Sequence, residues 1–317
     1  MSRTGGVPPY RELTRVDALH ARHAWGVFGE HDQLGRVNLL TPERVAAACR
    51  EAVSGDVFNL SLPLHLPDPP WVPARSRFRH EMFMLDQNMQ DDWLDGFYLQ
   101  ASTQWDGLRH VRAGGLGYYG GRQAGQAGPD GAELGIENWA EHGLVGRGVV
   151  GDVARQAAAA GQPLDPRSGT PITAKMLDDV LAAQHTQLRA GDFLLLRTGY
   201  LTAYLQAGDD ERASFNVQRD CPGLHGGEDM AEYLWDRGVV GVAADNPAVE
   251  VVPVDRAAGS LHRRLIPRLG FVLGEFFNLE RLAADCAADG RYTCLLVGVP
   301  LNLTGGVGSP GNAIAIK

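Results

Sequence analysis

Positive charge, paired cysteines and long apolar runs are all scarce in this 317-residue sequence. Its 29 Lys and Arg are outnumbered by 38 Asp and Glu, which gives a net charge of -9 at pH 7. Nucleic acids and anionic membranes bind clustered cations, so neither is an expected partner. The cysteines form no Cys-x-x-Cys pair, which argues against a zinc ribbon or a disulfide framework. They are Cys49, Cys221, Cys286 and Cys294.

No apolar run approaches the roughly 20 residues that a membrane-spanning helix needs. The first residues also contain no apolar signal core. We therefore expect a cytoplasmic protein whose partner is a small molecule. Hydrophobic residues nevertheless make up 44% of the sequence, which is enough to bury a substantial core.

Short apolar segments alternate with helical patterns along much of the chain. Continuous apolar runs predict strands that are covered on both faces, and they span 193–197, 239–244 and 293–301. Further strand patterns span 57–64, 78–85, 97–101 and 144–150. Helical patterns span 173–184, 228–236 and 279–288. The last two helices end where a glycine can form the C-terminal cap, at Gly238 and Gly290.

A helix is predicted to begin at Thr41. This residue suits an N-cap, Pro42 suits the first helical position, and Glu43 favours the positive end of the helix dipole. Residues 1–40 are predicted to form an arm that packs on the body or on a neighbouring subunit, because they hold too many aromatic residues for a disordered tail. Residues 41–317 contain no evident repeat or linker and are predicted to form one domain.

The densest group of chemically versatile side chains is the stretch Q-A-S-T-Q-W-D-G-L-R-H, which begins at Gln100. Amide, carboxylate and imidazole groups can all bind a divalent cation, and a histidine can also move protons. On a straight strand Gln100 and Gln104 would lie ~13 Å apart, so sharing an ion would require the chain to curl. Gln104 and Asp106 can both reach inward from an extended segment, with His110 just beyond them.

Two distant residues are candidates to complete such a site. His262 and Glu275 flank the apolar stretch 265–274, whose length suits two strands or a strand and a bend. Glu275 follows this apolar run, so it should be buried. A buried glutamate needs a cation or a hydrogen-bond partner.

Each candidate also has a simpler role when it is considered alone. The glutamines could form ordinary hydrogen bonds, Asp106 could cap a turn, and His110 could be a core histidine. Several aromatic residues near the motif could line a substrate pocket or belong to the core. They are Trp93, Phe97, Trp105, Tyr118 and Tyr119.

The motif resembles the H-x-G-T-H-x-D-x-P-x-H fingerprint of the cyclase family of metal-dependent hydrolases, which includes bacterial kynurenine formamidases and isatin hydrolases. The Thr, the Asp and the final His match in register. Gln100 and Gln104 replace the two ligand histidines, Ser102 replaces the glycine and Leu108 the proline. These replacements are similar to the branch typified by trans-dienelactone hydrolase, which has Q-x-x-x-Q-x-D-x-x-x-H with a downstream His and Glu. The resemblance runs from about Trp25 to the C-terminus.

The resemblance implies an α/β protein with a swivelling β/β/α fold, in which helices wrap a barrel-like mixed sheet. It also implies homodimers or homotetramers. Gln104, His262 and Glu275 would bind a divalent metal ion, with Gln100 and Asp106 binding it or lying beside its ligands. His110 would transfer protons, supported by Asp106. Zn²⁺ is the family expectation, and the oxygen-rich ligand set leaves Mn²⁺ or Mg²⁺ open.

These roles lead to the hypothesis of a metal-dependent hydrolase. A metal-bound water would attack a lactone, an ester or a cyclic amide, and His110 would act as the acid/base. One alternative is a metal-assisted cyclase or dehydratase of secondary metabolism, in which the ion stabilises an enolate. Another is a non-catalytic binding protein on a decayed hydrolase fold, motivated by the two replaced histidines.

Overall fold

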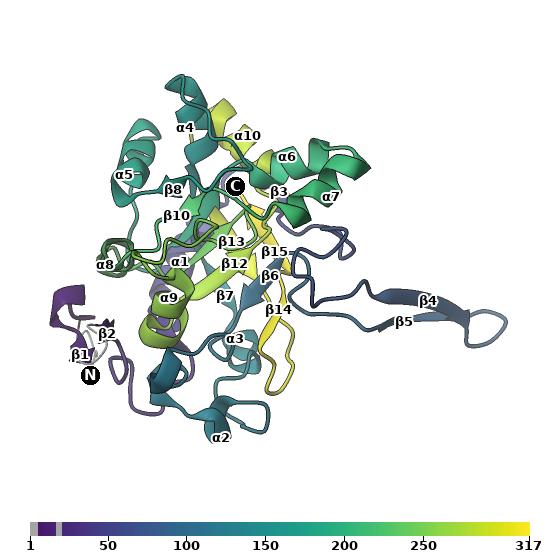
Figure 1. Ribbon diagram of the computed structural model, residues 1–317, viewed down its shortest axis with the longest axis horizontal. Helices are drawn as coiled ribbons and strands as arrows, with labels where there is room; N and C mark the ends of the chain where they lie inside the picture. The colour runs from purple at the N-terminus through teal and green to yellow at the C-terminus, as the bar shows by residue number, and fades with distance from the viewer. Residues whose placement is uncertain (1–5, 17–20) are drawn as a thin grey trace.

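The computed structural model describes residues 6–16 and 21–317 (Figure 1). Its centre is a nine-stranded mixed sheet with the strand order β14-β6-β12-β11-β9-β7-β13-β15-β3. The strands are β3 (Val57–Asn59), β6 (Gln104–Asp106), β7 (Leu144–Asp152), β9 (Phe193–Arg197), β11 (Gly241–Ala244), β12 (Val272–Glu275), β13 (Thr293–Gly298), β14 (Gly308–Pro310) and β15 (Ala313–Ile316). Strands β7, β9, β11 and β12 run parallel, and antiparallel strands extend the sheet on both sides.

Helices surround this curled sheet, so the predicted α/β class with a barrel-like mixed sheet is confirmed. The α-helices are α1 (Pro42–Ala48), α2 (Ala124–Ala127), α3 (Glu137–His142), α4 (Val153–Ala159), α5 (Ala174–Ala183), α6 (Tyr200–Gln206), α7 (Asp209–Val217), α8 (Glu228–Asp236), α9 (Leu261–Leu269) and α10 (Glu280–Asp289). Short 3-10 helices are η1 (Tyr10–Glu12), η3 (Gly35–Leu39), η4 (Cys49–Glu51), η5 (Gly114–Leu116) and η6 (Tyr119–Gly121).

Among the described residues, three small sheets lie outside the central one. They are formed by β1 (Thr14–Val16) with β2 (Ala21–His23), β8 (Pro171–Ile172) with β10 (Gly223–Leu224), and β4 (Arg79–Met84) with β5 (Gln90–Asp95). The β4–β5 hairpin projects from the body as a long ribbon (Figure 1).

The strongest sequence patterns are confirmed. Helices α5, α8 and α10 coincide with the predicted helices to within one or two residues, and Gly290 caps α10 in the left-handed conformation. Thr41 is the N-cap of α1, as its side chain accepts a bond from the backbone N–H of Arg44. The apolar runs form β9, β11 and β13, and 144–150 belongs to β7. Capping chemistry and continuous apolar runs were therefore reliable guides.

Other strand predictions are wrong. The predicted strand at 97–101 is absent, turns and bends occupy 99–103, and the strand of the motif begins only at Gln104. In the stretch 265–274, helix α9 reaches Leu269 before β12 begins. Pro267 lies inside this helix although it lacks the N–H that would bond to the carbonyl of Arg263.

Described parts of the N-terminal segment pack on α8 and α9. The backbone N–H of Tyr10 donates to Asp236 at 2.7 Å, and the Tyr10 hydroxyl bonds to Glu228. The indole N–H of Trp25 donates to the carbonyl of Pro267 at 2.8 Å. A domain boundary at residue 40 and a contact with a neighbouring subunit stay predictions. Within the described ranges, no helix is both long and apolar enough to cross a membrane.

Candidate metal centre

Two residues of the candidate site, His262 and Glu275, lie on the unit formed by β11, α9 and β12. Because β11 and β12 are parallel, the N-terminus of the connecting helix α9 lies at the same end of the sheet as their carboxyl ends. His262 is the second residue of α9, and Glu275 is the last residue of β12. The chain connection therefore brings both side chains to this end of the sheet.

The pairing of β6 with β12 places Gln104 and Asp106 beside these two residues. Strand β6 lies antiparallel between β12 and β14, and this register places Gln104 directly opposite Glu275. Side chains two residues apart on a strand share a face, so Asp106 lies on the same face as Gln104. The turn before β6 is fixed by Thr103, whose hydroxyl donates to the carbonyl of Phe276 at 2.6 Å and accepts from the N–H of Leu62.

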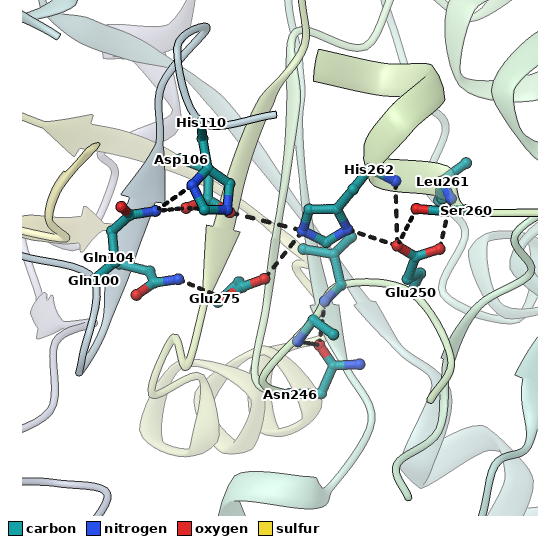
Figure 2. A network of polar contacts seen from close by, with 12 residues as sticks. Gln100, Gln104, Asp106, His110, Asn246, Glu250, Ser260, Leu261, His262 and Glu275 are labelled. Carbon is teal, nitrogen blue, oxygen red and sulfur yellow. Dashed lines mark hydrogen bonds and ion pairs between the residues drawn. The ribbon is translucent and has the colours of Figure 1, made fainter. Parts of the chain in front are cut away.

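Asp106, His262 and Glu275 form a compact cluster in which both carboxylates are buried and His262 is partly buried (Figure 2). One ligand atom from each residue lies within 4.8 Å of the others. His262 Nε2 is 3.1 Å from Glu275 Oε1 and 3.7 Å from Asp106 Oδ2. Ligand bonds to Zn²⁺ are about 2.0–2.2 Å long, so atoms at these separations can share one ion.

Two oxygen atoms of the cluster are buried without a hydrogen-bond partner. They are Gln104 Oε1 and Asp106 Oδ2. Buried polar atoms are almost always satisfied, and a cation in the cluster would satisfy Asp106 Oδ2. Nε2 of Gln104 donates to Glu275 Oε2 at 2.5 Å, so the amide would have to turn over to present its oxygen to an ion. With that rotation, the donors present fit a divalent cation.

Gln100 and His110 lie on the opposite side of Asp106 from His262 (Figure 2). The amide nitrogen of Gln100 donates to Asp106 Oδ1 and lies 3.1 Å from His110 Nδ1. His110 Nε2 is 3.8 Å from Asp106 Oδ1, and the His110 side chain is 27% exposed. The structure therefore brings all the predicted site residues together. The nitrogen of Gln100, and not its oxygen, faces Asp106, and metal binding by any of them stays a prediction.

The pKa values of the cluster reflect two carboxylates in a buried space. Burial raises the pKa of Glu275 to about 7, and the Asp106 carboxylate adds to this rise. Burial acts on Asp106 in the same direction, but His110 and His262 outweigh it and hold the pKa of Asp106 below its usual range. Burial lowers the pKa of His262, but bonds to its carboxylate neighbours hold that pKa well above 6.5. Protons thus occupy the cluster near neutral pH, and an entering cation would have to displace them.

Glu250 is a functional candidate that the sequence reasoning missed. It is 4% exposed and lies in the loop after β11. Its carboxylate accepts from the backbone N–H of Leu261 at 2.5 Å, the hydroxyl of Ser260 at 3.0 Å and His262 Nδ1 at 2.8 Å. It therefore caps α9 and turns Nε2 of His262 toward the cluster. Glu250 is the one acidic residue within the apolar run 248–252, and this pattern could have identified it as a buried acid. The same pattern identified Glu275.

We expect Glu250→Gln to lower the affinity for a divalent ion about 10- to 100-fold, the usual effect of losing a partner that orients a ligand histidine. Saturating metal should restore most of the activity, because Glu250 does not itself face the cluster. Metal titration followed by an activity assay at saturating metal measures both effects. Wild-type affinity in this variant would show that Glu250 does not position His262.

The aromatic residues near the motif divide between core and surface. Trp105 is fully buried, and its ring packs on Phe277 at 4.6 Å. Tyr119 is also buried, whereas Trp93 is exposed on β5. Trp105 and Tyr119 therefore belong to the core. A cavity of about 170 Å³ borders Ala101, which follows Gln100, and its other lining residues include Leu64 and Phe78.

The fold and the buried carboxylate–imidazole cluster together define an α/β protein with a candidate metal centre. A sequence model described as "Putative cyclase" matches residues 58–251, and a crystal structure described as a novel cyclase is 36% identical. That likeness covers 93% of this chain and 99% of the other, with a TM-score of 0.82. The chain belongs to the cyclase family. His262 and Glu275 lie beyond the matched segment, so their place in the site comes from the structure.

More distant structures share the fold. Isatin hydrolase A from Labrenzia aggregata, bound to benzyl benzoate, is 19% identical, and the likeness covers 86% of this chain and 97% of the other with a TM-score of 0.57. A predicted metal-dependent hydrolase from Bacillus stearothermophilus is 18% identical, with coverages of 83% and 98% and a TM-score of 0.50. A comparison with curated protein sequences finds no match. The family prediction is confirmed, and the trans-dienelactone hydrolase-like branch stays a prediction.

Proposed function

We propose that this chain is a metal-dependent hydrolase that opens a lactone, an ester or a cyclic amide. The observation that carries the proposal is the buried cluster of Asp106, His262 and Glu275, with ligand atoms within 4.8 Å of one another. The unsatisfied Oδ2 of Asp106 supports it. Structures with the same fold are described as isatin hydrolase A and as a predicted metal-dependent hydrolase.

Asp106, His262 and Glu275 would hold the ion, and Gln104 would join them through its amide oxygen. When bound, a divalent ion polarises a carbonyl group and lowers the pKa of a bound water from about 15.7 toward 7. Zn²⁺ is the expected ion, and Mn²⁺ or Mg²⁺ also suits these donors. Gln100 would hold Asp106 and His110 in place through its amide nitrogen.

His110 has the geometry expected of the proton-transfer residue. Its side chain is 27% exposed, so a substrate can reach it, whereas that of His262 is 14% exposed and engaged by Glu250 and Glu275. His110 would take a proton from the attacking water and return it to the leaving oxygen or nitrogen.

Hydrolysis of a panel of lactones, esters and cyclic amides by the metal-supplemented protein tests this function. We expect ring opening or ester cleavage of at least one class, with loss of activity after chelation and recovery when the metal is restored. A protein that binds metal but hydrolyses none of the panel would contradict a hydrolase. Proton exchange or dehydration without hydrolysis would instead favour the metal-assisted cyclase or dehydratase.

A further inference from the structure

Two adjoining cavities outside the candidate metal centre are lined by arginine side chains. Their volumes are about 930 and 680 Å³, and both are bordered by Leu188, Arg189 and Arg237, so they form one groove. Among the described residues, six arginines and three acids line this groove, although acids outnumber Lys and Arg in the whole chain. The arginines of this arginine groove are Arg36, Arg44, Arg147, Arg189, Arg237 and Arg291.

The arginine groove lies at the opposite end of the central sheet from the candidate metal centre. Residues 188–190 and 235–238 line it, and these segments precede β9 and β11. The groove therefore borders the amino ends of these two parallel strands. Glu275 is instead the last residue of β12, which runs parallel to β11. A molecule bound in the groove would be separated from the metal centre by the length of the strands.

Much of the positive charge in the groove is not neutralised within the chain. Two of the six arginines, Arg147 and Arg237, form ion pairs with acidic side chains. Arg44 and Arg291 donate to backbone carbonyls, at 2.8 and 3.0 Å. The exposed side chain of Arg189 forms no hydrogen bond or ion pair with any described residue. A concave surface with an excess of one charge attracts ligands of the opposite charge.

Arg36 is the buried arginine of the groove. Its guanidinium lies 4.3 and 4.4 Å from the ring centroids of Trp235 and Phe271, and its Nη1 has no hydrogen-bond partner among the described residues. Burial lowers the pKa of Arg36 to about 9, because a buried cation without a paired anion is costly. Arg36 is fully buried, so its charge would act on an anion through the wall of the groove, where the dielectric constant is low.

We propose that the arginine groove binds a small organic anion that carries at least two carboxylate or phosphate groups. Arginine recognises both groups through its paired N–H donors. The volume of the groove suits a metabolite-sized ligand. Leu39, Leu188 and Trp235 also line the groove and would contact the carbon skeleton of the ligand. The proposal is independent of the proposed hydrolysis, since no residue of the groove belongs to the candidate metal centre.

Calorimetric titration of the full chain at constant ionic strength tests the groove. The probes are propane-1,2,3-tricarboxylate and fructose 1,6-bisphosphate, which distinguish a preference for carboxylates from one for phosphates. We expect at least one of them to bind at one site per chain with a Kd below about 1 mM. Acetate, which has a single carboxylate, should bind at least about tenfold more weakly. Absence of binding by both probes, or acetate binding as tightly as they do, would overturn the proposal.

Substitutions in the groove test where the anion binds. Arg189→Gln combined with Arg291→Gln should weaken binding at least about tenfold, because each change removes a charged donor. Arg189→Gln alone should already weaken it several-fold, and this side chain has no partner whose loss could disturb the fold. Arg256→Gln, at an exposed position outside the groove, is the matched control and should bind the anion as the wild type does.

Glu275→Gln separates the groove from the metal centre, and this variant should bind the anion with wild-type affinity. Loss of binding in Glu275→Gln would place the anion at the metal centre. Unchanged binding in the Arg189 and Arg291 variants would place it elsewhere on the surface. Either result would overturn the proposal.

Discussion

Glu275→Gln is expected to abolish stoichiometric binding of a divalent ion and to slow hydrolysis at least about a thousandfold. The substitution removes a negative donor that lies 3.1 Å from His262 and directly opposite Gln104 on the paired strand. Stabilisation by a bound ion is worth several kcal/mol, and each 1.36 kcal/mol changes a rate tenfold. Metal analysis and kcat/KM of the same preparation measure both effects.

The stability of this variant separates loss of the ion from loss of the fold. Burial and the Asp106 carboxylate raise the pKa of Glu275 to about 7, so the ionised side chain destabilises the ion-free protein above that pH. The ion-free variant should therefore unfold at pH 8 no more readily than the ion-free wild type. The exposed Glu141→Gln is the matched control and should change neither metal content nor rate. A Glu275→Gln protein that kept both its ion and its activity would remove Glu275 from the ligand set.

His110→Asn is expected to keep the ion and to lower kcat about 10²- to 10⁴-fold, the usual contribution of a general acid or base. His110 lies at the rim of the cluster, and its closest contact there is the amide of Gln100 at 3.1 Å. Metal content, kcat and the pH profile of kcat should be measured together. If His110 is the acid/base, the part of the pH dependence of kcat that its ionisation causes should disappear in the variant. His31→Asn, at an exposed position, is the matched control. Full activity would refute the acid/base role, and loss of the ion would make His110 a ligand instead.

The local part of the site could be predicted from the sequence. Gln104 and Asp106 are two residues apart on a strand, so they had to share a face. Gln100 and Gln104 would lie too far apart on a straight strand to share an ion, so the chain was expected to curl before Gln104. The structure has turns and bends at 99–103. Burial of Glu275 followed from the apolar residues around it, and its exposure is 7%. Each of these inferences depended only on neighbours in the sequence.

The tertiary part of the site could not be predicted from local patterns. The pairing of β6 with β12 joins residues about 170 positions apart, and no periodicity encodes which strands become neighbours. His262 lies near the N-terminus of α9, and the apolar stretch 265–274 was expected to hold strands or a bend instead of the end of a helix. Glu250 acts only because the loop after β11 folds over that same helix end. The stretch 78–85 has strand character, but nothing in its residues showed that it would leave the body as the β4–β5 hairpin.

The remaining alternative from the sequence is a binding protein that has lost catalysis together with the two ligand histidines. The cluster argues against it, because Asp106, His262 and Glu275 are still gathered within ligand distance. A decayed site would have no reason to keep two acids buried near one another without a cation.

Calorimetric titration of the ion-free protein with Zn²⁺ or Mn²⁺ tests the central claim most directly. We expect saturable binding at the cluster, with proton release that is visible as a dependence of the heat on the buffer. Because the pKa of Glu275 is about 7 and that of His262 is held well above 6.5, protons compete with the ion as the pH falls. Affinity should then weaken about tenfold per pH unit below 7 for each proton displaced. Absence of saturable binding at pH 8, or binding that Glu275→Gln leaves unchanged, would contradict the account.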